Sequence, residues 1–486
     1  MKKMKKKIFY LFISLVILVT SCELPNNIDP KNPSAVPAGS EFMQAHISLV
    51  NQLGSINVNT NISRLLAQFQ SEVTYVTESR YNFSDRQIPD AYSGNLYNGV
   101  LMNLKDCKQK LEALQLAGDL ATVRDNQVAI LEVLSVYGYQ LLVDNFGNVP
   151  YTESLLGATN SRPKYDDALT IYKDLVTRID AAIAKLTAGA DFGGFGSYDI
   201  LYSDDMSLWL KFAASLKLRI GMRLADVTGS NASTIVSQAV ATGVFTSQDE
   251  SAIQTYTGVA PYVNSYYQEF ILGNRKDFCP TTTLVNMMNT LNDPRRAIWF
   301  TPYPSAGVYT GMQYGKTASS NYSAYSHFTS IPNPKYPVIL LDYVGVEFML
   351  AEAAERSFVG VPADAAGHYN NAILASMSYW GVSEADAAAY LAQPTVAYAT
   401  ATGTYKQKIG TQKWLGLFDQ GDEAWFEWRR LDFPILNFPQ GMTYADIPKR
   451  MPYPFNENKM NKVNYDAAAA AIGGDLASTK LFWDKF

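Results

Sequence analysis

Apolar residues recur with a helical period through much of this chain, and they limit its fold more than any other feature. The clearest stretch follows Arg162-Pro163-Lys164-Tyr165 and has Asp166 as its expected N-cap. Its apolar residues return to one helix face: Leu169, Tyr172, Leu175, Ile179, Ile183 and Leu186. Further helices are predicted at 41–53, 62–76, 96–116, 123–143, 206–227, 341–356 and 363–379. The sequence therefore predicts a mostly α fold.

Neighbouring helices of this length suggest stacked hairpins of the tetratricopeptide-like kind. No 34-residue consensus is legible, so an irregular all-α domain is the alternative. The helix at 206–227 is largely apolar, and we expect its cations to pair with acids or with carbonyl groups at helix ends: Lys211, Lys217, Arg219 and Arg223. Long irregular segments complete the fold, above all 243–337, in which Ala252 to Thr257 is a candidate strand.

The first 22 residues have the pattern of a lipoprotein signal peptide. Five lysines precede an apolar run from Ile8 to Val19, which is shorter than the roughly 20 residues that a membrane-spanning helix needs. Small residues before Cys22 resemble a bacterial lipobox, in which cleavage leaves the cysteine as a lipidated N-terminus. An ordinary signal peptide with an incidental cysteine is the alternative. We therefore expect a leader at 1–21, an extended proline-rich tether at 22–39, and a single domain at 40–486.

Composition argues against several classes of protein. With 47% apolar residues in a chain of 486, a large core can form. Loss of the leader and its five lysines leaves 35 basic and 45 acidic residues, and this balance argues against a nucleic-acid partner. The three histidines lack metal-ligand spacing, and no nucleotide-binding or nucleophile motif is present, so we expect no metal and no cofactor. The spacing of Cys107 and Cys279 leaves open whether they pair.

Several segments, in this order, resemble recurring segments of the SusD-like outer-membrane lipoproteins of Bacteroidetes. They are NIDPKNPS at 27–34, NFGNVPYTE at 145–153, WLKFAASLKLR at 209–219, IGTQKWL at 409–415, GDEAWFEWRR at 421–430 and PKRMPYP at 448–454. The resemblance implies a scaffold of tetratricopeptide-like units, against which irregular segments form a ligand site. It also implies a non-enzymatic protein, lipid-anchored in the outer membrane and facing outward. Such a protein binds an oligosaccharide or similar nutrient and has a SusC-like TonB-dependent transporter as its partner.

Two aromatic segments without helical periodicity are the expected ligand site. Trp299 to Phe328 holds eight aromatics in thirty residues, and Lys316 is its only formally charged residue. Aromatic rings can stack on the apolar face of a sugar, although a loop held down by its own aromatics is the alternative. In Tyr75 to Asn95, tyrosines alternate with arginines and an amide that can bind sugar hydroxyls. The predicted ligand-binding residues are Tyr81, Arg86, Tyr92, Asn95, Trp299, Tyr303, Tyr309, Tyr322 and Tyr325.

Two other functions are open from the sequence: a surface glycoside hydrolase, or a non-catalytic structural lipoprotein that binds only protein. The pairs Asp204-Asp205 and Asp422-Glu423 invite the first. Adjacent helix residues point in different directions, so we interpret these pairs as structural, with Asp204-Asp205 at a helix start. The run Trp425 to Arg430 is interpreted as a packed, ion-paired core.

Overall fold

A computed structural model describes residues 36–486 of the chain. The predicted leader, the lipidation site Cys22 and most of the tether at 22–39 lie outside the described residues. The longer helices are α2 (Ala38–Gly54), α5 (Met102–Glu112), α6 (Asp119–Phe146), α7 (Ala168–Ala188), α8 (Met206–Arg223), α9 (Ala232–Thr242), α12 (Tyr343–Glu355), α13 (Ala365–Tyr379), α15 (Tyr405–Gly416) and α16 (Gly421–Leu431).

Shorter elements lie between and around these helices. They are α3 (Ser63–Leu66), α4 (Ile88–Gly94) with a π-helical continuation at Asn95–Leu101, α10 (Thr282–Thr290), α11 (Arg296–Trp299), α14 (Glu384–Leu391), α17 (Glu457–Met460) and α18 (Lys462–Ala471). Three antiparallel two-stranded ladders pair β1 (Gln70–Glu72) with β5 (Phe278–Pro280), β2 (Val149–Pro150) with β3 (Tyr165–Asp166), and β4 (Ala252–Gln254) with β6 (Val338–Leu341).

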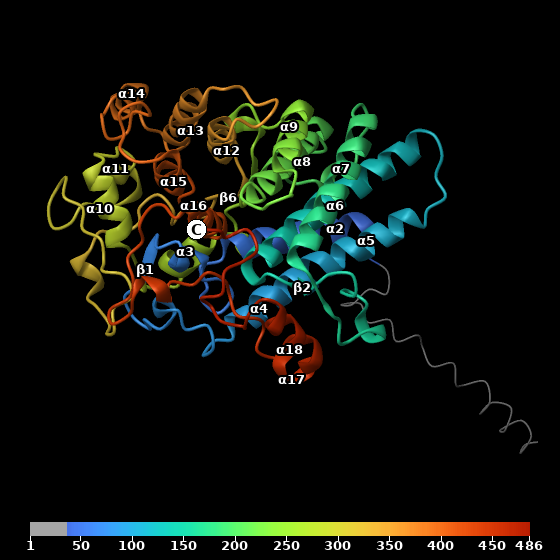
Figure 1. The fold of residues 1–486 in the computed structure, drawn as a ribbon, viewed down its shortest axis with the longest axis horizontal. Coiled ribbons are helices and arrows are strands. Elements are labelled where there is room, and N and C mark those ends of the chain that lie inside the picture. Colours follow the sequence, from blue (N-terminus) through green and yellow to red (C-terminus); the bar gives the residue numbers. More distant parts are fainter. Residues whose placement is uncertain (1–35) are drawn as a thin grey trace, which may run out of the picture.

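Helices that are neighbours in sequence pack side by side. α5 contacts α6, α6 contacts α7, and the series continues through α8 and α9, while α12 packs on α13 and α15. Figure 1 shows α2 and α5–α9 on one side of the molecule, with α12, α13 and α15 nearer its centre and α10, α11 and α14 at the opposite end. The prediction of a mostly α, hairpin-based fold with long irregular segments is confirmed.

Helix α7 shows how local sequence sets an element. Its buried stripe includes four of the predicted residues, Tyr172, Leu175, Ile179 and Leu186, together with Ile171. The predicted Leu169 and Ile183 are half-buried. The N-cap is one residue later than expected, because the side chain of Asp167 accepts from the Thr170 amide at 2.8 Å. Asp166 instead lies in β3, where its carboxylate accepts from the amides of Tyr151 and Thr152 at 3.1 and 2.8 Å.

Two expectations about elements were wrong. The helix predicted at 62–76 ends at Leu66, because Gln68 adopts a left-handed conformation with a φ of 59° and the chain then enters β1. The region 243–337, expected to be irregular, contains α10 and α11 as well as the confirmed strand β4. The helix predicted at 62–76 fails because β1 forms a ladder with β5, which lies some 200 residues later in the sequence.

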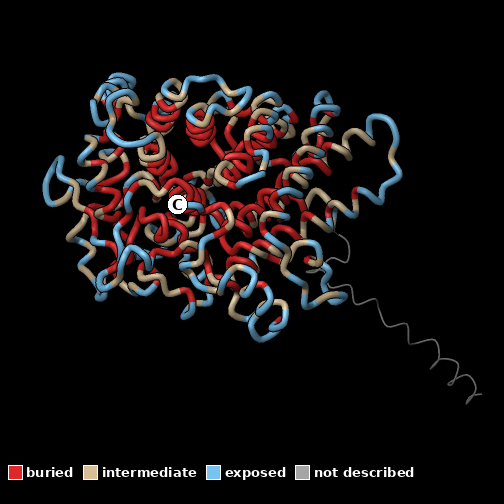
Figure 2. Tube along the Cα trace, viewed as in Figure 1, coloured by how far each residue is buried: buried red, intermediate tan, exposed pale blue. Residues whose placement is uncertain are grey.

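The core is centred on α16, whose residues are all buried (Figure 2). Arg223 of α8 contacts Asp144 of α6 at 3.2 Å and Glu423 of α16 at 2.9 Å. Lys413 and Arg430 both reach Glu427 at 2.6 Å. The run Trp425 to Arg430 is therefore the packed, ion-paired core that was predicted, and each buried cation has the partners that burial requires.

The cations of α8 and the acids at its start are also explained. Lys217 pairs with Asp180 at 2.5 Å, and Arg219 donates to the Leu340 carbonyl at 3.0 Å. Asp205 caps α8 by accepting from the Ser207 and Leu208 amides, which confirms its helix-start role, whereas Asp204 accepts from the Gly194 and Gly196 amides at 2.9 Å. Cys107 and Cys279 are buried and free, and burial raises the pKa of both thiols to about 12.

Residues 36–486 contain neither a candidate membrane-spanning helix nor a candidate metal-binding cluster. None of their helices is long and apolar enough to span a bilayer. No cluster of three or more side chains suited to hold a metal ion occurs in this part of the chain either.

Candidate functional site

The two aromatic segments come together at the surface, on the β1–β5 side of the molecule. Arg80 links them, because its Nη1 donates at 2.8 Å both to the Gly315 carbonyl and to the Gln440 carbonyl. The Ser320 amide donates to the Val73 carbonyl at 2.8 Å. A third segment, 437–446, thus joins the two that the sequence singled out. We call the surface formed by these three segments the aromatic surface.

Tyr322 and Tyr325 lie half-buried on the aromatic surface. The ring of Tyr322 stacks on His327, with centroids 3.8 Å apart and planes 6° apart, and burial raises the Tyr322 pKa to about 12. The hydroxyl of Tyr325 accepts from Lys316 Nζ at 3.4 Å. Both rings pack on one side against a small buried cluster of Val73, Cys279 and Met312, which holds the rings in place while part of each stays accessible.

Tyr81 lies where the first and second segments meet. Its ring centroid is 6.0 Å from that of Tyr314, and its backbone is left-handed with a φ of 65°. It is half-buried, and burial raises its pKa well above the ordinary value for tyrosine. The third segment contributes Tyr444, which is 36% exposed, and Gln440, whose Oε1 accepts from Thr317 Oγ1 at 3.3 Å.

Tyr303 and Tyr309 lie on the part of the second segment that folds back beside Tyr325. The backbones of Thr310 and Ser326 are joined by a hydrogen bond of 2.9 Å. Arg296 lies over the ring of Tyr309, with its guanidinium carbon 5.7 Å from the centroid. Both tyrosines are half-buried, so each combines a fixed position with an accessible portion.

Two predicted ligand-stacking residues are wrong, because both are wholly buried. Trp299 has no exposed surface and stacks on Phe418 with centroids 3.9 Å apart. Tyr92 also has none, and its hydroxyl donates to Asp422 at 2.8 Å. Neither ring has a face free for a ligand, so both act in the core. The alternative of a segment held down by its own aromatics describes Trp299 correctly.

Arg86 and Asn95 lie apart from the contacts that join the three segments. Arg86 pairs with Glu78 at 2.5 Å and donates to Asn59 at 3.0 Å, and it lines a small groove of about 70 Å³ together with Tyr75. Asn95 donates to Gln52 of α2 at 2.8 Å. The polar groups of both side chains are therefore engaged by protein partners.

The groove beside Arg86 also contains a buried carboxyl. Glu72 accepts from the Ser79 amide at 2.7 Å, and burial, assisted by neighbouring Glu78, raises the Glu72 pKa to about 9. Glu78 is held by Arg86. The two carboxyl groups are thus engaged in fixing the turn at residues 72–79.

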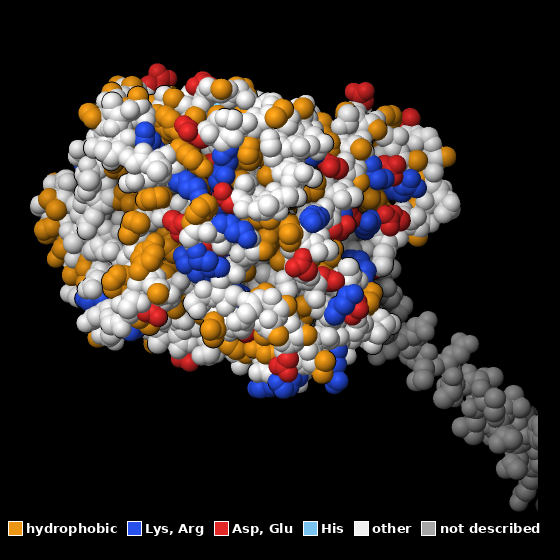
Figure 3. Space-filling model, in the orientation of Figure 1, with side chains coloured by type: hydrophobic (Ala, Val, Ile, Leu, Met, Phe, Trp, Pro, Cys, Tyr) orange, Lys and Arg blue, Asp and Glu red, His pale blue; other side chains and the backbone are white. Residues whose placement is uncertain are grey.

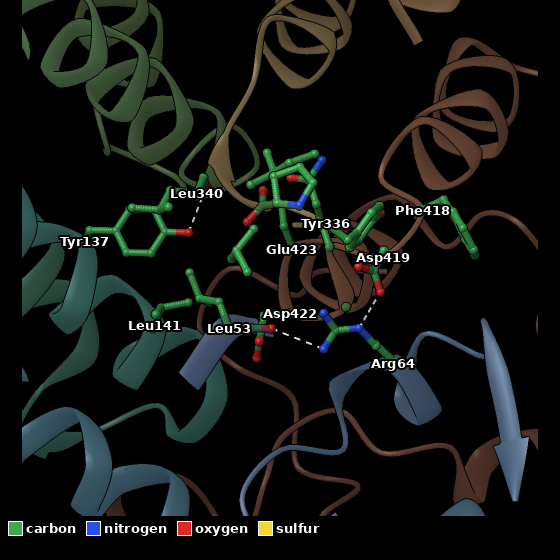
Figure 4. Close-up of a pocket in the computed structure, with 15 residues that line it drawn as sticks. Leu53, Arg64, Tyr137, Leu141, Tyr336, Leu340, Phe418, Asp419, Asp422 and Glu423 are labelled. Carbon is green, nitrogen blue, oxygen red and sulfur yellow. Dashed lines mark hydrogen bonds and ion pairs between the residues drawn. The ribbon is translucent and has the colours of Figure 1, made fainter. Parts of the chain in front are cut away.

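A small cavity of about 30 Å³ lies between α3, α6 and the start of α16 (Figure 4). Arg64 spans it, donating to Asp419 at 2.6 Å and to the Leu53 carbonyl at 3.1 Å. Tyr137 donates to the Leu340 carbonyl at 2.8 Å. A space of this size suits buried water rather than a sugar, so we assign it to the polar core.

The sequence indicates Arg80 as one of the arginines of the Tyr75 to Asn95 segment, but it could not reveal Gln440 and Tyr444 as parts of the surface. Arg80 and Gln440 are 360 positions apart, and 437–446 carries no unusual composition. Tyr75 lies in the first aromatic segment, and at 67% exposure it is the most accessible aromatic of that segment.

On the face drawn in Figure 3, basic and acidic side chains are interspersed with hydrophobic ones.

Comparisons with known proteins agree on one family. Residues 30–454 match the SusD-like family described as "Starch-binding associating with outer membrane". Among solved structures, a chitin-binding protein is similar at 25% identity with a TM-score of 0.77, over 92% of this chain and 100% of that one. A SusD-like protein from Bacteroides thetaiotaomicron VPI-5482 is similar at 24% identity and a TM-score of 0.78, over 92% and 99%.

A chitin-binding SusD homolog from Flavobacterium johnsoniae is similar at 23% identity and a TM-score of 0.78, over 92% of this chain and 98% of that one. No curated protein sequence matches the chain. The family match covers most of the chain, and the resemblance stated from the sequence is confirmed. The protein belongs to the SusD-like family of binding proteins associated with the outer membrane.

Proposed function

We propose that this protein is a non-enzymatic, cell-surface nutrient-binding lipoprotein that captures an oligosaccharide on the aromatic surface. In this proposal Cys22 carries the lipid anchor, and a SusC-like TonB-dependent transporter receives the ligand. Family membership supports the class of function, and the name of the similar chitin-binding protein supports a glycan ligand. The observation that carries the assignment to this surface is the convergence of three segments around Arg80.

The chemistry of the surface suits a neutral sugar chain. Tyr81, Tyr322 and Tyr325 are half-buried against the protein and remain partly accessible, so they can contact a sugar without first being ordered. Gln440 and Lys316 supply an amide and an ammonium group beside the rings, where they can bind hydroxyl groups. Tyr303 and Tyr309 extend the same surface.

A glycan panel tests the proposal directly. Full-length protein in detergent is titrated with starch and chitin oligosaccharides, and Tyr81→Ala, Tyr322→Ala and Tyr325→Ala are compared with the wild type. If a ring stacks on the sugar, its loss should weaken binding roughly 5- to 150-fold, since buried aromatic anchors contribute on the order of 1 to 3 kcal/mol. Tyr262→Ala is the matched control, because Tyr262 is 56% exposed on another segment and should bind as the wild type does.

Other outcomes would overturn the assignment. Release of reducing ends that continues beyond one equivalent would favour a glycoside hydrolase. Wild-type affinity in all three variants would place the site elsewhere. Failure to bind any glycan, together with binding to a surface protein, would favour the structural lipoprotein.

A further inference from the structure

A second cavity, apart from the aromatic surface, opens beside α4. Its volume is about 390 Å³, larger than the cavity of about 230 Å³ on the other side of residues 154–156. Its walls come from α4 and the π-helical turn after it, from the β2–β3 region, and from residues 453–457 just before and within α17. Figure 1 shows α4 and β2 near one another in the lower half of the molecule, with α17 below them at its edge. The volume lies within the range of small-molecule sites.

Hydrogen bonds between the walls fix the shape of this cavity. The Asp90 carboxylate accepts from the amides of Phe455 and Asn456 at 2.8 and 2.9 Å, which joins α4 to the C-terminal segment. The Tyr97 hydroxyl donates to the Pro150 carbonyl at 2.6 Å, and the Tyr165 hydroxyl donates to Glu457 at 3.2 Å. Because these bonds span three separate segments, the cavity is formed before any ligand enters, and little ordering would accompany binding.

The lining has the mixed character that a sugar ring needs. Leu142, Phe146 and Val149 contribute apolar surface, while Tyr97 and Tyr165 are half-buried aromatic rings whose hydroxyls are already engaged. The side chains of Asn98 and Asn456 are exposed at the cavity. Neither amide makes a side-chain hydrogen bond with any residue in the described part of the chain. Each can therefore bind a hydroxyl group as donor and as acceptor.

The charge of the lining narrows the ligand class. Two carboxylates, Asp90 and Glu457, line the cavity, and none of its lining residues within the described range is a lysine or arginine. An anionic ligand such as a uronic acid would meet like charge without a countercharge. Asp90 already accepts two amide hydrogens, and Glu457 accepts from Tyr165 and from Asn461. These bonds stabilise the carboxylates without a cation, so a neutral hydroxylated ligand fits best.

We propose that this cavity is a second ligand site, which binds one neutral sugar residue, either free or at the end of a chain. It is additional to the aromatic surface and uses none of the tyrosines assigned there. The class of ligand follows from the volume, the aromatic and amide lining, and the absence of lysine and arginine among its lining residues.

Gly94 offers a sharp test. It lines the cavity and has ordinary helical geometry, with a φ of −59°, and a Cβ placed on it would meet no atom within 4 Å. Gly94→Leu should therefore fill part of the cavity without backbone strain. Gly94→Ala is the matched control, since it makes the same change in helix propensity and adds only a methyl group.

The experiment uses full-length protein in detergent and ligand-detected NMR with glucose, N-acetylglucosamine and glucuronic acid. We expect the two neutral sugars to bind, with glucuronic acid at least tenfold weaker. Gly94→Leu should weaken the neutral sugars at least tenfold, Gly94→Ala should not, and Asn98→Ala and Asn456→Ala should each weaken them about three- to tenfold. Thermal melts of all four variants verify that they are folded.

Tyr325→Ala separates this proposal from the proposed function, because it should weaken oligosaccharide binding at the aromatic surface and leave monosaccharide binding intact. The second site is overturned if neither neutral sugar binds the wild type, if glucuronic acid binds as tightly as glucose, or if a folded Gly94→Leu protein binds as Gly94→Ala does. None of these results concerns the aromatic surface, which the oligosaccharide titrations test alone.

Discussion

His46 shows how strongly burial can act on a single titratable residue. It lies in α2 with 1% of its surface exposed, and its Nε2 contacts Gln254 Oε1 at 3.0 Å. Burial lowers its pKa to about 4, against a small opposing effect of the Gln254 hydrogen bond and of Asp199. The folded protein therefore keeps His46 neutral at pH values where the unfolded chain binds a proton.

Stability should consequently fall as pH falls from about 6.5 towards 4, because the unfolded state takes up the proton first. The loss from this residue is on the order of 3 kcal/mol by pH 4, from a difference of roughly 2.5 pKa units. Urea unfolding at pH 7 and pH 4.5 measures it. His46→Gln should lose less stability over this interval than the wild type, and an equal loss in both proteins would contradict the assignment.

Glu72 titrates in the opposite sense. Burial and the neighbouring Glu78 raise its pKa to about 9, so the folded protein retains a proton that the unfolded chain releases above about pH 4.5. Its contribution to stability is therefore lost progressively as pH rises from about 4.5 towards 9. Glu72→Gln mimics the protonated carboxyl and can still accept from Ser79. We expect the stability difference between variant and wild type to grow in the variant's favour from pH 5 to pH 8, and a difference independent of pH would refute this.

Tyr92 should affect stability rather than ligand affinity. Tyr92→Phe removes the hydroxyl that donates to buried Asp422 and leaves the ring in place. Loss of a hydrogen bond to a buried carboxylate costs about 1.5 to 3 kcal/mol. We expect a lower melting temperature with unchanged glycan affinity, the reverse of the result expected for Tyr325→Ala. Weaker binding at unchanged stability would return Tyr92 to the ligand site.

At the scale of elements, apolar periodicity predicted the helices whose positions depend on local sequence alone. α7, α8, α12 and α13 lie where the apolar pattern predicts helices. α7 and α13 bury one face, whereas α8 and α12 are buried around most of their circumference. The end of α3 and the strand β1 were not predictable, since β1 exists only through its ladder with β5. The residues around β1 do not indicate that it pairs with β5, which lies far along the chain.

Part of the candidate site could also be predicted from local sequence, and part could not. Aromatic density identified the segment 299–328, and Tyr322 and Tyr325 do lie on a surface. It could not separate these rings from Trp299, because burial of Trp299 depends on Phe418, more than a hundred residues away. The cavity beside α4 could not be predicted from the sequence, since its walls come from three segments that are far apart in the chain and meet only in the folded protein.

The cap of α7 gives a prediction about a whole element. Asp167→Ala removes the side chain that accepts from the Thr170 amide, and an N-cap of this kind is worth about 1 kcal/mol. Chemical denaturation should show a loss of that size, and Asp167→Asn should restore most of it because asparagine also caps helices well. If Asp167→Asn is as unstable as Asp167→Ala, the residue acts through its charge instead.

At the scale of the whole molecule, α16 joins parts of the chain that are far apart in sequence. Its acidic and basic side chains pair with Arg223 of α8, Glu352 of α12 and Lys413 of α15. Asp422 of the same helix holds Tyr92 of α4. The irregular segments that form the aromatic surface therefore rest on a core whose charges fix the relative positions of several helices.

The proposed attachment to a membrane through a lipid concerns the whole molecule, and it is inferred from the sequence of the first 22 residues. Five lysines, the apolar run from Ile8 to Val19 and the small residues before Cys22 form the pattern of a cleaved and lipidated leader. A single lipidated cysteine would tether residues 36–486 to the membrane surface. A single acyl chain binds a membrane only weakly, and stable anchoring usually needs a second chain or a second contact with the membrane. A lipoprotein cysteine that carries more than one acyl chain would therefore anchor the protein stably.

Cys22→Ala should therefore convert a membrane-associated protein that needs detergent for extraction into one that is soluble after leader cleavage. Fractionation of cells into membrane and soluble parts, followed by immunodetection, measures the change. Cys279→Ala is the control, because Cys279 is a buried, free thiol and its variant should stay with the membrane. Glycan affinity of the released Cys22→Ala protein should match that of the wild type, since the lipid lies outside both proposed ligand sites. Unchanged membrane association of Cys22→Ala would mean that the leader acts as an ordinary signal peptide and that another contact holds the protein at the surface.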